Sequence, residues 1–216
     1  DDWEEGHDYA DWVKQQGGNL DELRQSEDRV PSELHQTTWA SERSIEFIKE
    51  EREKPWLLNV NIYDPHPPFT PPKSYADQFD PDKMPGPHFR ESDLEAQAKL
   101  AECDFQDEVR TPEEHDAKGV QARYYAMIAQ IDDQFGRILK VLDETGQREN
   151  TVIIFTSDQG PFEGGSSEEL NSNGPLRGAK RSLYEGGIRV PFIVRWNGRI
   201  PAGETSDEVI AFWDML

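Results

Sequence analysis

Residues 151–160 read Thr151-Val152-Ile153-Ile154-Phe155-Thr156-Ser157-Asp158-Gln159-Gly160, and this stretch decides the fold class. Its first six residues form a continuous apolar, β-branched run, which is typical of a strand buried on both faces of a parallel sheet. Its last four residues turn polar where the predicted strand ends, and α/β proteins collect their functional side chains at that end. The stretch therefore predicts a strand that carries chemistry at its carboxyl end.

An amphipathic helix precedes this strand. Apolar side chains recur there at spacings of three and four residues: Tyr124, Met127, Ile128, Ile131, Phe135, Ile138, Leu139 and Leu142. The pattern predicts a helix from about Val120 to residue 145, with Gly146 as its C-terminal stop. Two shorter helices are expected, from about Thr38 to Glu53 and from about Glu91 to Ala101.

Two further segments read as strands, Trp56–Ile62 and Pro191–Trp196. Strand, helix and strand in this order predict a right-handed βαβ crossover. We therefore expect an α/β fold, with a mostly parallel sheet flanked by helices, and residues 1–216 to be part of a single domain. Residues 73–118 mix Pro, Asp, Glu and scattered aromatic residues, and are expected to form a surface excursion.

Composition excludes several classes of protein. Lys and Arg total 23 and Asp and Glu total 44, so the net charge is 23 − 44 = −21. So acidic a chain is unsuited to nucleic acid or an anionic membrane surface as partner. The single cysteine, Cys103, excludes an internal disulfide and a multi-cysteine metal site. The sequence has no apolar run of the ~18 residues that a transmembrane helix needs.

Asp158 and Gln159 place a carboxylate and an amide oxygen side by side at a strand end. Hard oxygen donors of this kind suit Ca²⁺ or Mg²⁺, which makes both residues candidate metal ligands. The alternative is that Asp158 caps the following turn through backbone amides.

His66 lies between the predicted strand 56–62 and a run of prolines. Five prolines in Tyr63-Asp64-Pro65-His66-Pro67-Pro68-Phe69-Thr70-Pro71-Pro72 exclude a helix and make the loop stiff. A stiff loop can hold an imidazole for proton transfer or contact with an anion. The alternative is a structural histidine that stacks on Phe69 or Trp56.

Four cations gather within residues 177–189, namely Arg177, Lys180, Arg181 and Arg189. Glycines between them allow the backbone to come close to a ligand. Such a cluster in an acidic chain suits a small anion such as sulfate or phosphate. The alternative is that these cations pair with neighbouring glutamates.

Three blocks of the sequence resemble the type I sulfatases, arylsulfatase-like members of the alkaline-phosphatase superfamily. They are Asp158-Gln159-Gly160, the stretch from Gly178 to Pro191 (Gly-Ala-Lys-Arg-Ser-Leu-Tyr-Glu-Gly-Gly-Ile-Arg-Val-Pro), and Asp64-Pro65-His66-Pro67-Pro68-Phe69. Their order also agrees with the family, and the resemblance covers roughly residues 38–216. It implies the alkaline-phosphatase-like α/β fold and hydrolysis of sulfate monoesters.

The resemblance also implies roles for single residues. Asp158 resembles the aspartate that binds the catalytic divalent cation, usually Ca²⁺, and Gln159 takes the neighbouring ligand position. His66 resembles the histidine that contacts the sulfate ester near the leaving-group oxygen, and Lys180 resembles the lysine that binds a sulfate oxygen. His66 and Lys180 are therefore the expected catalytic and substrate-binding residues.

The family's nucleophile motif, Cys/Ser-x-Pro-x-Arg, is absent, since Cys103 is followed by Asp104-Phe105-Gln106-Asp107. We expect this chain to be an internal part of a sulfatase that lacks the upstream formylglycine and a C-terminal subdomain, and to be inactive by itself. Two alternatives stay open: a phosphate or phosphonate ester hydrolase of the same superfamily, and a non-catalytic descendant that binds a sulfated glycan or calcium. The family implies a sulfated small molecule or glycan as substrate and an exported protein.

Overall fold

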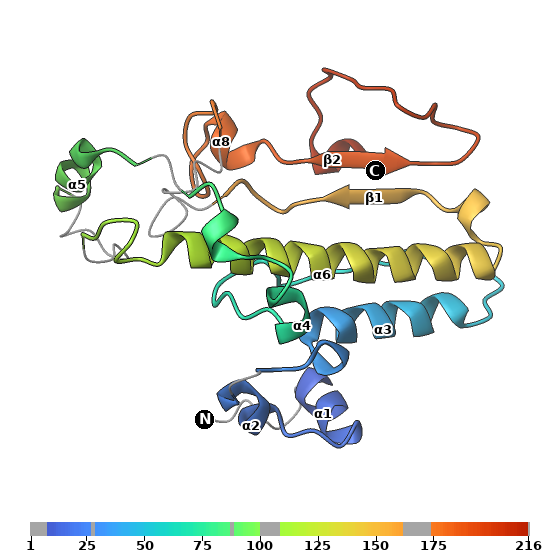
Figure 1. Cartoon of the computed structure of the whole chain (residues 1–216). Helices are drawn as coiled ribbons and strands as arrows, with labels where there is room; N and C mark the ends of the chain where they lie inside the picture. The colour runs from blue at the N-terminus through green and yellow to red at the C-terminus, as the bar shows by residue number, and fades with distance from the viewer. Residues whose placement is uncertain (1–7, 27–28, 87–88, 100–108, 162–173, 216) are drawn as a thin grey trace.

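The computed structural model describes residues 8–26, 29–86, 89–99, 109–161 and 174–215. A long helix, α6 (Ala117–Glu144), runs through the middle of the molecule. Helix α3 (Gln36–Lys49) lies along one side of α6, and strands β1 (Ile153–Thr156) and β2 (Phe192–Arg195) lie along the other (Figure 1).

Helix α6 confirms the helix predicted from the spacing of apolar residues, although it starts at Ala117, nearly one helical turn before the expected Val120. It ends at Glu144, and Gly146 follows with φ of 70°, a left-handed conformation that glycine adopts without strain. Its two apolar sides serve different neighbours. One side packs against α3, and on the other the Phe135 ring lies 5.6 Å from the Phe155 ring of β1.

The main core lies between α3 and α6. Ile45 and Ile48 of α3 meet Ile138, Val141 and Leu142 of α6, and all five are buried. Burying a side chain of this size stabilises the fold by about 1.5–3 kcal/mol. A second, smaller core joins the N-terminal helices α1 (Asp8–Gln15) and α2 (Leu20–Gln25) to α3 through Tyr9, Trp12 and Val13.

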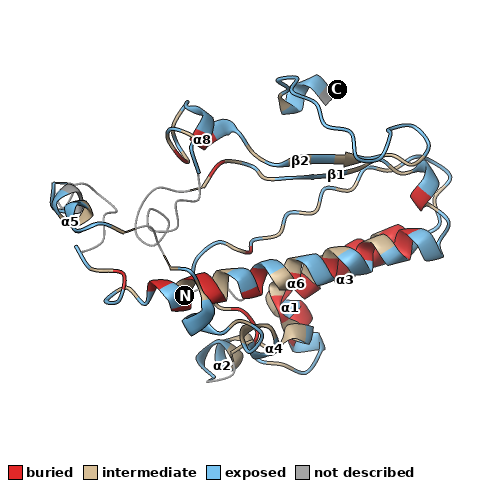
Figure 2. Ribbon diagram, turned by 45° about the horizontal axis from the view of Figure 1, so that its top comes forward, coloured by how far each residue is buried: buried red, intermediate tan, exposed pale blue. Residues whose placement is uncertain are grey.

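The two strands pair differently from the sequence expectation. β1 and β2 are antiparallel, with Ile153 opposite Arg195 and Thr156 opposite Phe192. The prediction that residues 151–156 are buried on both faces is also wrong for this chain, since Ile154 and Phe155 are each 42% exposed. A β-branched run identifies a strand, but its burial depends on which other segments cover it. Figure 2 shows the buried residues concentrated in the helices and the sheet largely exposed.

Residues 56–62 are extended but make no strand ladder with the described part of the chain. Trp56 and Leu58 pack against the main core, and the Trp56 indole donates a 3.0 Å hydrogen bond to Gln147. The segment runs in the same direction as β1, toward the end where α6 begins (Figure 1). The predicted βαβ crossover therefore lacks its first hydrogen-bonded strand, and the mostly parallel sheet stays a prediction.

Short elements connect these parts. They are the 3₁₀ turns Ser32–Leu34, Pro81–Lys83, Arg148–Asn150 and Phe212–Met215, and the helices α4 (Lys73–Ala76), α5 (Glu91–Ala98) and α8 (Glu185–Ile188). Within the expected excursion, the Tyr75 hydroxyl of α4 donates a 2.9 Å hydrogen bond to Asp133 of α6. None of the helices in the described ranges is both long and apolar enough to cross a membrane.

Candidate functional site

Asp158 and Gln159 lie just beyond the carboxyl end of β1. The Asp158 side chain is exposed, and its carboxylate accepts a 3.1 Å hydrogen bond from the Gln159 side-chain amide. Among the described residues no backbone amide donates to Asp158, so the turn-capping alternative gains no support. The two side chains that the sequence predicts as metal ligands therefore face each other.

A turn that contains Lys180 is joined to this strand end by backbone hydrogen bonds. The Lys180 amide donates to the carbonyl oxygen of Pro161 at 2.7 Å, and the Gly160 amide donates to Gly187 at 3.0 Å. A third bond, from the Gly186 amide to Arg177 at 2.8 Å, closes the turn on itself. Asp158, Gln159 and Lys180 thus belong to one connected piece of backbone.

Glycine permits this close approach. A Cβ atom on Gly160 would overlap the carbonyl oxygen of Gly186, and a Cβ on Gly186 would overlap that of Gly178. Gly178 also has φ of 78°, a conformation that L side chains rarely adopt. These glycines therefore bring the Lys180 turn against the strand end, and a larger residue at any of the three positions would displace it.

The cations near Lys180 differ in their contacts. Arg189 pairs with Glu185 at 3.6 Å, as the structural alternative predicts, and the Arg177 guanidinium lies 3.7 Å from the centre of the Tyr184 ring. In the described part of the chain, no carboxylate pairs with the Lys180 ammonium, and its side chain is half-buried. Lys180 is therefore the member of the cluster best placed to bind an external anion.

His66 lies on an exposed part of the proline loop. Its Nδ1 is 2.7 Å from the Pro67 carbonyl oxygen, and its ring lies against the Tyr63 ring, with the ring centres 4.8 Å apart and the planes inclined at 46°. Because a carbonyl oxygen can only accept, Nδ1 carries the hydrogen, and Nε2 is left to hold or release a proton. The described residues make no hydrogen bond to Nε2. The structural alternative expects His66 to stack on Phe69 or Trp56, but its aromatic contact in the described part of the chain is the tilted one with Tyr63.

The three candidate groups are only partly brought together. Asp158, Gln159 and Lys180 are joined as described, whereas no contact within the described ranges links His66 to any of them. The segment that leads to His66 and the strand that leads to Asp158 nevertheless end at the same end of the molecule (Figure 1). Residues 56–62 are not paired with the sheet in the described part of the chain, so the expectation that polar strand ends gather on one side of the sheet stays a prediction.

Asp158 and Gln159 are the right kind of ligand for a hard cation, but two residues are too few to form its site. Asp158 and Gln159 offer oxygen atoms, and Ca²⁺ takes six to eight of them. No group of three or more His, Cys, Asp or Glu side chains in the described part of the chain is arranged to hold a metal. These two residues alone do not make a calcium or magnesium site. Cys103 lies outside the described residues.

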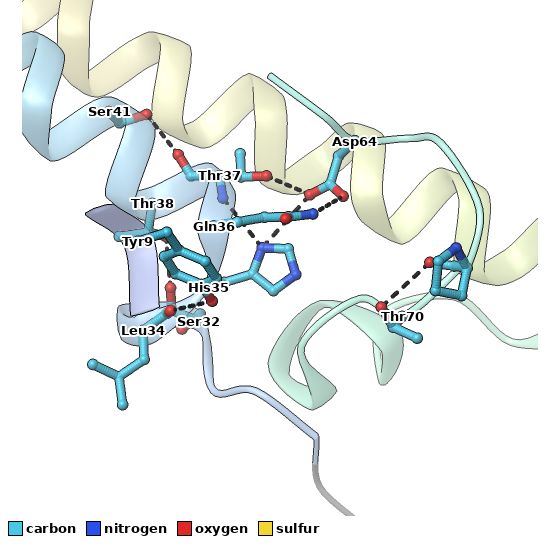
Figure 3. Close-up of polar contacts among 11 residues, drawn as sticks. Tyr9, Ser32, Leu34, His35, Gln36, Thr37, Thr38, Ser41, Asp64 and Thr70 are labelled. Atoms are coloured by element: carbon cyan, nitrogen blue, oxygen red, sulfur yellow. Dashed lines mark hydrogen bonds and ion pairs between the residues drawn. The ribbon is translucent and has the colours of Figure 1, made fainter. Parts of the chain in front are cut away.

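Sequence reasoning missed a buried polar cluster beside the His66 loop (Figure 3). The Asp64 side chain is almost fully buried, and its carboxylate accepts hydrogen bonds from Thr37 and, at 3.2 Å, from Gln36. His35 caps helix α3, because its Nδ1 accepts from the Thr37 amide at 3.4 Å, and that nitrogen lies 3.5 Å from Asp64. The sequence signal was a polar run, His35-Gln36-Thr37-Thr38, at the start of a helix.

Burial lowers the pKa of His35 below its ordinary value near 6.5, because desolvation disfavours the charged ring. The negative charge of Asp64 and a hydrogen bond to the backbone of Thr70 act in the opposite direction but are smaller. A neutral ring can accept from Thr37 with Nδ1 and donate to Thr70 with Nε2. His35 therefore contacts both ends of the loop that carries His66.

Comparison with known proteins gives matches over most of the chain. Residues 5–216 match the family model described as Sulfatase. The chain is 32% identical over 221 residues to the multifunctional alkaline phosphatase superfamily protein PehA of Trinickia caryophylli, covering 88% of the chain and 41% of PehA. It is also 32% identical over 192 residues to an arylsulfatase of Clostridium perfringens, covering 85% of the chain and 37% of that enzyme.

A solved structure shows the same fold. The phosphonate monoester hydrolase SpPMH from Silicibacter pomeroyi superposes with a TM-score of 0.67 at 20% sequence identity, covering 90% of the chain and 42% of that protein. The chain thus spans about two fifths of the length of the proteins that it matches. The family match extends over nearly every residue, including the His66, Asp158 and Lys180 segments, and the chain belongs to the sulfatase family.

Proposed function

We propose that the full-length protein hydrolyses sulfate monoesters at a site built from the Asp158–Gln159 strand end and the Lys180 turn. The observation that carries the proposal is the hydrogen bond between the Lys180 amide and Pro161, which ties a cation to a pair of oxygen donors. An anionic ester needs positive charge at its oxygen atoms as its bond breaks. The likeness to a curated arylsulfatase supports sulfate as the anionic group.

Lys180 is proposed to bind a sulfate oxygen. Its ammonium has no paired carboxylate in the described part of the chain, so an incoming sulfate does not have to compete with an internal partner. Its half-buried position reduces screening by water, which strengthens the attraction to a developing negative charge.

His66 is proposed to act at the leaving group. With Nδ1 directed at the Pro67 oxygen, the protonated ring presents Nε2–H, which can donate to the ester oxygen as the S–O bond breaks. The gain is largest for an alcohol that is a poor leaving group, because such an oxygen needs a proton most.

Asp158 and Gln159 are proposed as two of the ligands of a Ca²⁺ or Mg²⁺ ion, with the remaining ligands supplied outside the described residues. Such an ion, when bound, would neutralise part of the charge of the sulfate group. The nucleophile is proposed to be a formylglycine formed from a cysteine or serine elsewhere in the full-length protein. The substrate is proposed to be a sulfated small molecule or glycan, and the protein to be exported.

The test is a comparison of substrates with the purified full-length protein. We expect 4-nitrophenyl sulfate to be hydrolysed with a kcat/KM at least ten times that for 4-nitrophenyl phenylphosphonate, a phosphonate monoester, or 4-nitrophenyl phosphate. A protein that binds sulfated sugars but hydrolyses none of the three esters would instead be the non-catalytic descendant.

A second function, hydrolysis of phosphate or phosphonate esters, is favoured by one observation. PehA, which is 32% identical over 88% of the chain, is described as a multifunctional member of the alkaline phosphatase superfamily. A lysine and a divalent cation serve a phosphonate oxygen as well as a sulfate oxygen. A kcat/KM for 4-nitrophenyl phenylphosphonate above that for 4-nitrophenyl sulfate would establish this second function in place of the first.

A further inference from the structure

The loop that carries His66 depends on contacts from outside the loop for its position on the protein. Prolines 65, 67, 68, 71 and 72 have no backbone N–H groups, so the loop has few donors with which to bind to the rest of the molecule. Proline fixes the internal shape of a loop but not its position on the protein surface. That position has to come from side chains outside the loop.

The structure shows such contacts at both ends of the loop. At the first end, the carboxylate of Asp64, two residues before His66, is held by Thr37 and Gln36 in the first turn of α3. At the second end, Arg29 donates a 3.0 Å hydrogen bond to the carbonyl oxygen of Phe69, and His35 contacts the backbone of Thr70.

The contact at Asp64 is the more deeply buried of the two. Both ends include a hydrogen bond to a charged group, the Asp64 carboxylate or the Arg29 guanidinium, but the bond from Thr37 to Asp64 is buried and that from Arg29 is only partly buried. A hydrogen bond is electrostatically stronger where water is excluded. The carboxylate also lies at the N-terminus of a 14-residue helix, where unpaired amide groups favour a negative charge. Asp64 is therefore the point at which α3 holds the loop (Figure 3).

We propose that Thr37 is a positioning residue for His66, acting through the buried carboxylate of Asp64. The inference rests on the proposed leaving-group role of His66. Thr37 does not touch the substrate. It donates to Asp64, and the short chain Asp64-Pro65-His66 carries that constraint to the imidazole. Loss of the Thr37 hydroxyl leaves a buried acceptor without one of its donors, so Asp64 moves and His66 moves with it.

The test variant is Thr37→Val in the full-length protein, which keeps the shape of the side chain and removes its hydroxyl. Thr38→Val is the matched control. Thr38 is the next residue of the same helix and is also buried, but its hydroxyl donates to Ser32 and not to the loop. Thr37→Ser, which keeps the hydroxyl, should restore the wild-type behaviour.

The kinetic readout is the ratio of kcat/KM for an activated aryl sulfate to that for an alkyl sulfate. A misplaced catalytic group costs about 10- to 100-fold, and this loss should fall on the alkyl sulfate. We therefore expect Thr37→Val to raise the ratio at least tenfold and Thr38→Val to change it less than twofold. In a His66→Ala background, Thr37→Val should change the ratio no further, because its effect passes through His66.

A second readout does not depend on activity. The ring signal of His66 in protein labelled with [¹³Cε1]-histidine, identified by its loss in His66→Gln, reports the position and protonation of the imidazole. We expect it to shift in Thr37→Val and to stay in place in Thr38→Val. If Thr37→Val does not fold, Gln36→Ala removes the other donor to Asp64 and is measured in the same way.

The outcomes separate the two proposals. If His66→Ala leaves the substrate ratio unchanged, the leaving-group role of His66 is wrong, and the ring signal alone decides whether Thr37 positions the imidazole. If His66→Ala changes the ratio but Thr37→Val acts like Thr38→Val, the positioning role of Thr37 is wrong. An unshifted His66 signal in Thr37→Val overturns the inference whatever the kinetics.

Discussion

The backbone amide of Lys180 donates a 2.7 Å hydrogen bond to the carbonyl oxygen of Pro161, which lies three residues after Asp158. This bond joins two segments that are about 20 residues apart in the sequence and contribute opposite charges. A cation and a carboxylate held near each other in this way can bind an anion and a divalent metal ion side by side. The proposed sulfate site depends on this relationship.

Removing the Lys180 ammonium should strongly impair catalysis. In the full-length protein we expect Lys180→Ala to lower kcat/KM for 4-nitrophenyl sulfate by about 10²–10³, the usual cost of losing one preorganised charge donor. Lys140→Ala, which removes an exposed lysine of α6, should change kcat/KM less than twofold. Steady-state kinetics on both variants make the comparison. Equal effects would exclude Lys180 from the site.

The packing of glycines around the Lys180 turn predicts a contrast between two Gly→Ala substitutions. Gly186→Ala places a methyl group on the carbonyl oxygen of Gly178, and overpacking of this kind costs about 1–3 kcal/mol. Gly136→Ala, in the interior of α6 with open space around it, should instead stabilise the protein by about 0.5–1 kcal/mol. Urea denaturation of the two variants measures both. A neutral Gly186→Ala would mean that the turn is not tightly packed against the strand end.

Calcium should stabilise the full-length protein through Asp158. A ligand present at 100 times its Kd stabilises a folded protein by about 2.7 kcal/mol, which appears as a rise in Tm. We expect Asp158→Ala to abolish this rise, and Asp207→Ala, the loss of an exposed acid after β2, to leave it intact. A calcium-dependent rise in Tm that survives in Asp158→Ala would contradict its assignment as a ligand.

His35 predicts the direction in which pH affects stability. Its pKa is lowered in the folded state, so the unfolded chain binds a proton more readily, and stability is lost as the pH falls below about 6.5. His35→Asn keeps a side chain able to cap α3 but cannot titrate. The loss of unfolding free energy between pH 7.5 and pH 5.5 should therefore be smaller in His35→Asn than in the wild type. Identical losses in urea titrations would contradict the account.

Much of the local structure could be predicted from the sequence, because α6 and α3 follow from the spacing of their apolar residues. Their pairing partners could not. A β-branched run such as Ile153–Phe155 identifies a strand, but its neighbour and their relative direction depend on long-range contacts, and β1 pairs antiparallel with β2. Residues 56–62 have the composition of a strand and the extended backbone, but no described partner for their hydrogen bonds.

The candidate site also has features that could be predicted from the sequence and features that could not. Asp158 and Gln159 can be predicted as candidates because polar residues follow a strand end, and a cluster of four cations among glycines can be predicted to bind an anion. The resemblance to the sulfatases singles out Lys180 from that cluster, and the structure joins its turn to the strand end. The buried contacts of Asp64 with Thr37 and His35 could not be predicted, because a polar side chain buried between a loop and a helix terminus leaves no periodic pattern. Their sequence separation of 27 and 29 residues offers no local signal.

The leaving-group dependence of His66→Ala tests the central claim most directly. Values of kcat/KM for an alkyl sulfate and for 4-nitrophenyl sulfate are measured on the same preparation of the full-length variant, so an inactive fraction cancels in their ratio. The account predicts a loss for the alkyl sulfate at least ten times the loss for the activated aryl sulfate, because only the poor leaving group needs the proton on Nε2. Equal losses on the two substrates would contradict it.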